Sequence, residues 1–124
     1  MGKRFFICEH CGNIIAMIRD NGVAIQCCGE KMKELVPNTV DASQEKHVPV
    51  VTRLDECLIK VEVGSVAHPM TPEHHIAFIY VETENGGMRI DLKDKPEAVF
   101  CTCNDKPIAV YEYCNLHGLW KVDL

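Results

Sequence analysis

One seven-residue stretch decides the fold: Cys57-Leu58-Ile59-Lys60-Val61-Glu62-Val63. Its odd-numbered positions are all apolar and would lie on one face of an extended strand, while Lys60 and Glu62 would lie on the other face. A period of two is typical of a strand that buries one face. The stretch therefore predicts a β-strand that covers a hydrophobic core.

Short β-rich runs of the same kind precede and follow this stretch. They cover residues 47–54, 75–82, 88–93, 98–103, 108–114 and 119–124. Turn signals separate several of them, among them Asn85-Gly86-Gly87 and Asn104-Asp105-Lys106-Pro107. No long amphipathic helix is evident. Seven short strands at regular spacing predict an all-β domain, a seven-stranded antiparallel β-sandwich.

The first 36 residues differ in character, because they hold four of the eight cysteines. Cys8 and Cys11 have the spacing of a metal-binding turn, and the adjacent pair Cys27 and Cys28 follows later. Asn21-Gly22 predicts a hairpin that folds the second pair back beside the first. So small a unit needs a cross-link, which four thiolates around one metal would supply. Zinc and iron both suit four sulfur ligands, so a structural zinc site and an iron site both stay open.

The domain boundaries follow from this division. Residues 1–36 form the small four-cysteine module, residues 37–46 form a linker and the start of the second domain, and residues 47–124 form the sandwich. The 124-residue chain carries a net charge of −5, and no run of Lys and Arg exceeds two residues. This balance gives no footprint for binding nucleic acid or an anionic membrane, so we expect neither partner.

The N-terminal residues bear on where the protein works. Only Phe5-Phe6-Ile7 separate Lys3-Arg4 from the first cysteine, whereas a signal peptide needs roughly 7–15 apolar residues. No segment reaches the roughly 18–20 apolar residues of a membrane span. We therefore expect a cytoplasmic protein, in whose reducing surroundings paired cysteines more often hold metal than form disulfides.

A second group of potential ligands is scattered over the sandwich. It consists of His47, His68, His74, Cys114 and His117. Each lies at an end of a predicted strand, where loops gather at a rim and bring distant residues together. Catalytic zinc rarely takes five protein ligands, whereas iron accepts both nitrogen and sulfur and prefers a higher coordination number. The set predicts an iron centre with one position left for a small molecule.

The remaining cysteines and histidines are expected to have structural roles. Cys101 and Cys103 have the spacing of residues on one strand face, and Cys57 begins another strand. Because free cysteines are among the most buried residues, we predict core thiols, with a C-x-C redox pair as the weaker alternative. We expect His10 to be a solvent-facing loop residue and His75 to be a packing or surface residue.

The strings around the second group resemble a known family. They are Glu45-Lys46-His47, His68-Pro69-Met70 with His74 after it, and Cys114-Asn115-Leu116-His117-Gly118. Over its whole length the chain resembles desulfoferrodoxin, the two-domain form of the non-haem iron superoxide reductases. Residues 1–36 look like the desulforedoxin module, and the remainder looks like the neelaredoxin-type catalytic domain.

The resemblance implies two iron ions per chain. One would be tetrahedral, on Cys8, Cys11, Cys27 and Cys28. The other would be square-pyramidal, with His47, His68, His74 and His117 in the plane and Cys114 as the axial thiolate opposite an open sixth site. The resemblance also implies an immunoglobulin-like sandwich, a homodimer and a rubredoxin-like electron donor. The implied reaction is the one-electron, two-proton reduction of superoxide to hydrogen peroxide without release of dioxygen.

Two residues beside the first histidine are candidates for catalytic roles. A cation next to an open metal site raises the local concentration of superoxide, and Lys46 can serve in this way and hold a proton-donating water. Glu45 resembles the carboxylate that occupies the sixth position of the oxidised centre. The alternative for both residues is a solvated loop pair.

Three other functions compete with the reductase. In an electron carrier the four-cysteine module would be the functional part and the sandwich its scaffold, which leaves the four histidines unexplained. A nucleic-acid-binding zinc module conflicts with the acidic balance of the chain. A superoxide dismutase would release dioxygen and would need no electron donor.

Overall fold

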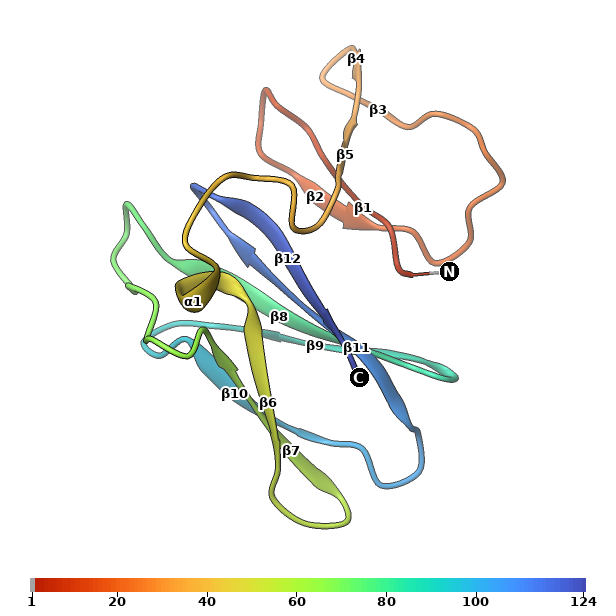
Figure 1. Cartoon of the computed structure of the whole chain (residues 1–124). Helices are drawn as coiled ribbons and strands as arrows, with labels where there is room; N and C mark the ends of the chain where they lie inside the picture. Colours follow the sequence, from red (N-terminus) through yellow and green to blue (C-terminus); the bar gives the residue numbers. More distant parts are fainter. Residues whose placement is uncertain (1) are drawn as a thin grey trace. The chain divides into compact units, whose positions relative to one another are not determined.

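Strands make up most of the regular structure that the computed structural model describes, which covers residues 2–124 (Figure 1). The chain divides into two compact units, with the boundary between Val36 and Pro37. In residues 2–124 no helix has the length and apolar character needed to cross a membrane. The regular structure is thus almost entirely β, as the periodicity predicts.

The first unit contains two small antiparallel sheets. Its three-stranded sheet has the order β2-β1-β5 and consists of β1 (Phe5–Ile7), β2 (Ile14–Ala16) and β5 (Lys33–Leu35). Its two-stranded sheet consists of β3 (Gln26–Cys27) and β4 (Glu30–Lys31).

The hairpin predicted at Asn21-Gly22 is wrong. Strand β2 pairs with β1, so the first hairpin turns through the segment that carries Cys8 and Cys11. The backbone N–H of Gly22 donates to Oδ1 of Asp20 at 2.8 Å, which closes a local turn without pairing strands. A tight turn between β3 and β4 presents the second cysteine pair instead, and its central residues Cys28 and Gly29 have φ of 53° and 76°.

The second unit is a β-sandwich of seven strands, as predicted. The three-stranded sheet has the order β10-β7-β6 and consists of β6 (Pro49–Arg53), β7 (Leu58–Val63) and β10 (Glu97–Cys101). The four-stranded sheet has the order β12-β11-β8-β9 and consists of β8 (Ile76–Thr83), β9 (Gly86–Asp91), β11 (Pro107–Cys114) and β12 (Gly118–Asp123). Every pairing within these two sheets is antiparallel.

The core lies between the two sheets and follows the predicted alternation of β7. Ile59, Val61 and Val63 are fully buried, and the charged residues between them are half-buried on the outer face. They pack in one cluster with Ile79 of β8 and Phe100 of β10. Both sheets thus present one apolar face to the same interior, which leaves the strand ends and their loops to carry polar residues.

A short helix replaces the end of the predicted linker. Helix α1 (Gln44–His47) precedes β6, so His47 ends a helix and does not begin a strand. Val48 takes the extended conformation, with φ of −70° and ψ of 123°. Extended backbone is what a residue before proline prefers, and Pro49 follows. The proline therefore marks the change from helix to strand.

Helix α1 is held against the turn that follows β7. The N–H of Val66 donates to the carbonyl of Glu45 at 3.0 Å, and the N–H of Gly64 donates to the carbonyl of Val48 at 3.2 Å. Gly64 has φ of 81°, and a Cβ there would lie 2.5 Å from the carbonyl oxygen of Glu45. Only glycine allows the helix to approach this closely.

The prediction of three core thiols is wrong. Cys57 and Cys103 form a disulfide, and Cys101 is an exposed free thiol. The reason is the alternation of side chains along the end of β10, where Phe100 and Thr102 point inward and are buried. The two cysteines therefore share the outer face, which agrees with their predicted common face but not with burial.

We expect the substitution Gly64→Ala to lower the free energy of unfolding by about 2 kcal/mol or more, because the added methyl group meets backbone and alanine disfavours positive φ. Chemical denaturation of the two proteins side by side measures the change. Gly86→Ala is the matched control, since a Cβ there meets nothing within 4 Å. Equal losses in both variants would contradict the close approach at Gly64.

Candidate metal centres

Four histidines and one cysteine meet at one end of the sandwich. They come from the end of α1, the segment between β7 and β8, the end of β11 and the turn before β12. They are His47, His68, His74, Cys114 and His117, and their potential ligand atoms all lie within 4.8 Å of one another. The structure therefore brings together all five residues that the sequence predicts for this site.

The closest approaches are between atoms suited to bind metal. Nε2 of His47 lies 3.2 Å from Nε2 of His68 and 3.1 Å from Nδ1 of His117. Sγ of Cys114 lies 3.4 Å from Nε2 of His68 and 3.9 Å from Nδ1 of His117. Such spacings match the edges of a coordination polyhedron whose bonds are about 2 Å long.

Backbone carbonyls fix which nitrogen of two histidines faces the group. Nδ1 of His47 donates to the carbonyl of Ser43 at 2.6 Å, and Nδ1 of His68 donates to the carbonyl of Pro69 at 2.7 Å. A neutral imidazole has one proton, so in both rings Nε2 is left as a lone pair. This is the arrangement that orients metal-bound histidines in proteins.

The group fits a cation and little else. The Nε2 lone pairs of His47 and His68 face each other at 3.2 Å with no proton to share. Nε2 of His74 is buried and has no hydrogen-bond partner among the described residues. Buried polar atoms without partners are rare in folded proteins. A metal ion bound by these atoms would satisfy all three nitrogens at once.

Burial sets the protonation of the group. It lowers the pKa of His47 and His74 and lowers that of His68 to about 4. These imidazoles are therefore neutral near pH 7, which is the form that binds metal. Burial also raises the pKa of the Cys114 thiol, while the N–H groups of Leu116 and His117 donate to its sulfur and act in the opposite direction.

Hydrogen bonds outside the group hold its loops in place. The side chain of Asn115 accepts from the N–H of His75 at 2.8 Å and donates to the carbonyl of Glu73 at 2.9 Å. It thereby ties the turn that contains His74 to the end of β11. The indole N–H of Trp120 donates to the carbonyl of His117 at 3.1 Å, and its ring stacks on that of His47.

Glu45 and Lys46 lie on α1 beside this group, and both are exposed. The positive charge of Lys46 helps to lower the pKa of both His47 and His74, so it acts across the short distance to the group. His10 and His75 lie outside the group, as predicted: His10 pairs with Glu30 on the surface of the first unit, and Nδ1 of His75 donates to the carbonyl of Thr71 at 3.0 Å.

The second candidate centre lies in the first unit. Cys8, Cys11, Cys27 and Cys28 have sulfur atoms within 4.8 Å of one another, with 3.7 Å between Cys11 and Cys27. The turn around Cys8 is tight, since its carbonyl accepts from the N–H of Gly12 at 2.9 Å.

Ionisation of these four thiols depends on what lies near each sulfur. The N–H of Cys11 donates to Cys8 and lowers the pKa of that thiol to about 6. The crowding of sulfur around Cys28, led by Cys11, raises its pKa to about 12. Four adjacent thiolates repel one another, so a cation is what allows all of them to ionise. The donor set suits a tetrahedral metal.

Sequence reasoning missed the groups that orient the ligands. The carbonyls of Ser43 and Pro69 have no sequence signal, because any residue carries one. Nothing in the spacing of Trp120 along the sequence indicates a ring stacked on a ligand. Glu112 was also missed: it is fully buried on β11 without a hydrogen-bond partner among the described residues, and burial raises its pKa to about 9.

Comparisons with known proteins agree with this geometry. Residues 39–123 match the family model described as Desulfoferrodoxin. A desulfoferrodoxin of Syntrophotalea carbinolica is 47% identical over 116 residues, which cover 92% of this chain and 90% of that protein. A superoxide reductase of Pyrococcus abyssi is 41% identical over 100 residues, which cover 65% of this chain and 87% of that protein.

A solved structure resembles the whole chain. The crystal structure of the superoxide reductase from Treponema pallidum superposes with a TM-score of 0.82 and 38% sequence identity. The match covers 99% of this chain and 100% of the other. With the family match over most of the chain, these similarities show that the chain belongs to the desulfoferrodoxin family.

Proposed function

We propose that this protein reduces superoxide to hydrogen peroxide at the group of four histidines and Cys114, using one electron and two protons and releasing no dioxygen. Superoxide reductase is the activity named for its relatives and for its structural neighbours, and the chain is an oxidoreductase of that kind. The observation that carries the proposal is the convergence of four imidazoles and one thiol within 4.8 Å.

Iron is the cofactor of both groups, with one ion in each. We propose Cys8, Cys11, Cys27 and Cys28 as the ligands of the first and His47, His68, His74, Cys114 and His117 as those of the second. When bound in the second group, ferrous iron would supply the electron that superoxide accepts. Of these ligands, His47 and His68 are buried imidazoles whose pKa values are lowered by burial, so they offer the neutral form that binds metal.

The surroundings of Cys114 bear on electron transfer. Cys114 is fully buried, and two backbone N–H groups donate to its sulfur. A thiolate ligand pushes electron density onto iron, and hydrogen bonds to its sulfur tune the potential. We propose that Leu116 and His117 set this tuning through their backbone N–H groups.

Lys46 is proposed to attract superoxide and to hold a water that donates a proton. Its side chain is exposed on α1 next to His47, and its positive charge contributes to the lowered pKa of His47 and of His74. Superoxide is an anion, and the chain as a whole is acidic. A local cation therefore counters the repulsion that the remaining surface exerts.

Glu45 is proposed to approach the group in the oxidised protein and to occupy the remaining position of the metal. Its backbone carbonyl accepts hydrogen bonds from the N–H of Val66 at 3.0 Å and from the hydroxyl of Ser65 at 3.3 Å. Its side chain is exposed and free to turn. The backbone thus anchors the residue without restricting the carboxylate.

The two units are proposed to have separate tasks. Residues 47–124 would carry the reaction, residues 37–46 would connect the parts and supply Glu45 and Lys46, and residues 1–36 would be the four-cysteine iron module. A rubredoxin-like protein is the proposed electron donor, and a homodimer is the proposed assembly. We place the protein in the cytoplasm, because both metal groups depend on reduced thiols.

The proposed activity is tested by stoichiometry. We expect a pulse of superoxide to yield an equal amount of peroxide, to consume one donor electron per superoxide, and to release no dioxygen. His74→Ala should abolish this turnover, whereas its neighbour variant His75→Ala should retain it because His75 lies outside the group. Dioxygen released in equal proportion to peroxide without donor oxidation would show a dismutase instead.

For Lys46 we expect the substitution Lys46→Gln to slow the reaction with superoxide by about 3- to 10-fold at low salt and to flatten its dependence on ionic strength. Pulse radiolysis at several salt concentrations measures both. Lys93→Gln removes an equal charge from an exposed site elsewhere and serves as the control. If both variants respond to salt as the unmodified protein does, Lys46 has no part in attracting the anion.

For Glu45 we expect Glu45→Ala to change the visible absorption of the oxidised protein, because a carboxylate is lost from the set of metal ligands. The reduced protein should keep its spectrum. Glu73→Ala, at an exposed position of a nearby loop, is the comparison. An oxidised spectrum identical to that of the unmodified protein would exclude the proposed role.

For the small module we expect Cys28→Ser to abolish or alter the absorption of the four-cysteine centre, while peroxide formation continues when a reductant is supplied. Cys101→Ser, at a free cysteine outside both groups, should leave both spectra unchanged. This experiment separates the reductase from the electron carrier. Loss of all superoxide reduction in Cys28→Ser, with the other centre intact, would favour the carrier.

A further inference from the structure

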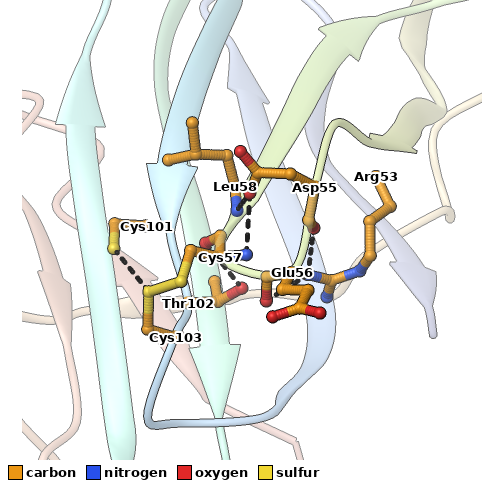
Figure 2. The surroundings of a disulfide bond; sticks show 8 residues. All are labelled: Arg53, Asp55, Glu56, Cys57, Leu58, Cys101, Thr102 and Cys103. Atoms are coloured by element: carbon orange, nitrogen blue, oxygen red, sulfur yellow. Dashed lines mark hydrogen bonds between the residues drawn. A yellow bond between two sulfur atoms is a disulfide. The ribbon is translucent and has the colours of Figure 1, made fainter.

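Three cysteines that belong to neither metal group lie together beside the loop between β6 and β7. Cys57 and Cys103 form a disulfide, and Sγ of Cys101 lies 3.5 Å from Sγ of Cys103 (Figure 2). Cys101 and Cys103 are exposed, and Cys57 is half-buried. A free thiol is thus in van der Waals contact with one sulfur of an accessible disulfide.

The backbone places these sulfurs side by side. Thr102 is buried, its N–H donates to the carbonyl of Cys57 at 2.6 Å, and its hydroxyl donates to the same oxygen at 3.4 Å (Figure 2). Because Thr102 points inward, its two neighbours point outward on the same side. The proximity of Cys101 to Cys103 is therefore a property of the strand end.

The loop that carries Cys57 is held independently of the disulfide. Oδ1 of Asp55 accepts from the N–H groups of Cys57 and Leu58, both at 2.8 Å. The guanidinium of Arg53 donates to the carbonyls of Asp55 and Glu56, both at 3.3 Å (Figure 2). These hydrogen bonds would keep Cys57 in place when its sulfur is released.

We propose that Cys57, Cys101 and Cys103 form a thiol–disulfide exchange site, with Cys101 as its resident thiol. The Cys101 thiolate attacks Sγ of Cys103, the bond between Cys103 and Cys57 breaks, and Cys57 leaves as a thiolate that takes a proton from solvent. One S–S bond forms for the one that breaks, so this internal step needs no oxidant or reductant.

The product of this step is sterically reasonable. Residues two apart on an extended strand have Cα atoms about 6.6 Å apart. Disulfides span Cα separations of roughly 4.4–6.8 Å. Because the sulfur atoms of Cys101 and Cys103 already lie 3.5 Å apart, bridging them requires an approach of about 1.5 Å.

The external substrate of the site is a small dithiol or the corresponding disulfide. A dithiol reduces the exposed bond in two exchange steps: its two sulfurs join in a disulfide, and the cysteine sulfurs leave as thiols with the two protons. The chemistry exchanges two electrons, unlike a one-electron metal centre. In a reducing compartment disulfides are typically transient ones of this kind.

The exchange site is separate from the histidine group. Helix α1, with His47, precedes β6, and the loop with Cys57 follows it. Strand β6, which separates the helix from that loop, has five residues and is therefore about 17 Å long. Exchange among these cysteines therefore does not depend on the proposed reduction of superoxide.

Disulfide mapping tests the proposal on the iron-loaded protein. The protein is equilibrated at pH 8, blocked with N-ethylmaleimide, digested without reduction and analysed by mass spectrometry. We expect two populations, one with the Cys57–Cys103 bond and a blocked Cys101, and one with the Cys101–Cys103 bond and a blocked Cys57. A single population in which only Cys101 is blocked would overturn the proposal.

Two variants make the test independent of the position of that equilibrium. In Cys57→Ser, equilibrated with a glutathione redox buffer, we expect a Cys101–Cys103 disulfide, and two free or glutathione-bound cysteines there would overturn the proposal. In Cys101→Ser all protein should keep the Cys57–Cys103 bond, and reduction by dithiothreitol should yield two thiols. Unchanged visible spectra of the iron centres show that each variant is folded.

Discussion

The structure depends on one electrostatic constraint: nitrogen lone pairs and a sulfur from separate loops face a single point in the interior of one end of the sandwich. Nδ1 of His47 and Nδ1 of His68 each donate their proton to a backbone carbonyl. Neither ring therefore has a proton to donate toward the other. Without a cation this arrangement is repulsive. The free energy of folding must therefore offset the repulsion between these side chains. A bound metal ion removes the repulsion and thereby stabilises the fold.

The packing of the sandwich holds the strand ends, and with them the ligand side chains, in place. The apolar faces of the two sheets close on a core of β-branched residues with Phe100 and Cys114, which packs β7, β8 and β11 against one another. Helix α1 can then reach the group only because Gly64 leaves room for the carbonyl of Glu45. Asn115 joins two loops that the strands bring side by side. Positioning is thus done by the close backbone approach at Gly64, by backbone carbonyls and by the side chains of Asn115 and Trp120.

The eight cysteines fall into three chemically different settings. Four gather in the small unit, where thiols crowd one another and ionise together only around a cation. One is buried among histidines and receives hydrogen bonds from the backbone. The remaining three lie on the outer face near the end of β10, away from any ligand set. The same side chain therefore serves metal binding in two places and sulfur exchange in a third, as its neighbours dictate.

The periodicity and spacing of residues in the sequence are sufficient to predict the β-sandwich and the ligands of the histidine group. The alternation from Ile59 to Val63 indicated a sandwich strand, and the strings around His47, His68 and Cys114 indicated the site. These signals are local, so the chain itself carries them. Pairing partners are not local: Ile14–Ala16 pairs with β1 and not across Asn21-Gly22, because the turn signal does not specify which strand is nearest.

Only the tertiary structure decided the remaining features. The disulfide between Cys57 and Cys103 joins residues 46 positions apart, and nothing in either neighbourhood predicts it. The carbonyls of Ser43 and Pro69 orient two imidazoles, yet every residue has a carbonyl. A donor's partner is set by where folding brings it, and that depends on the packing of the whole domain. Residue types thus revealed the chemistry, whereas geometry in three dimensions chose the partners.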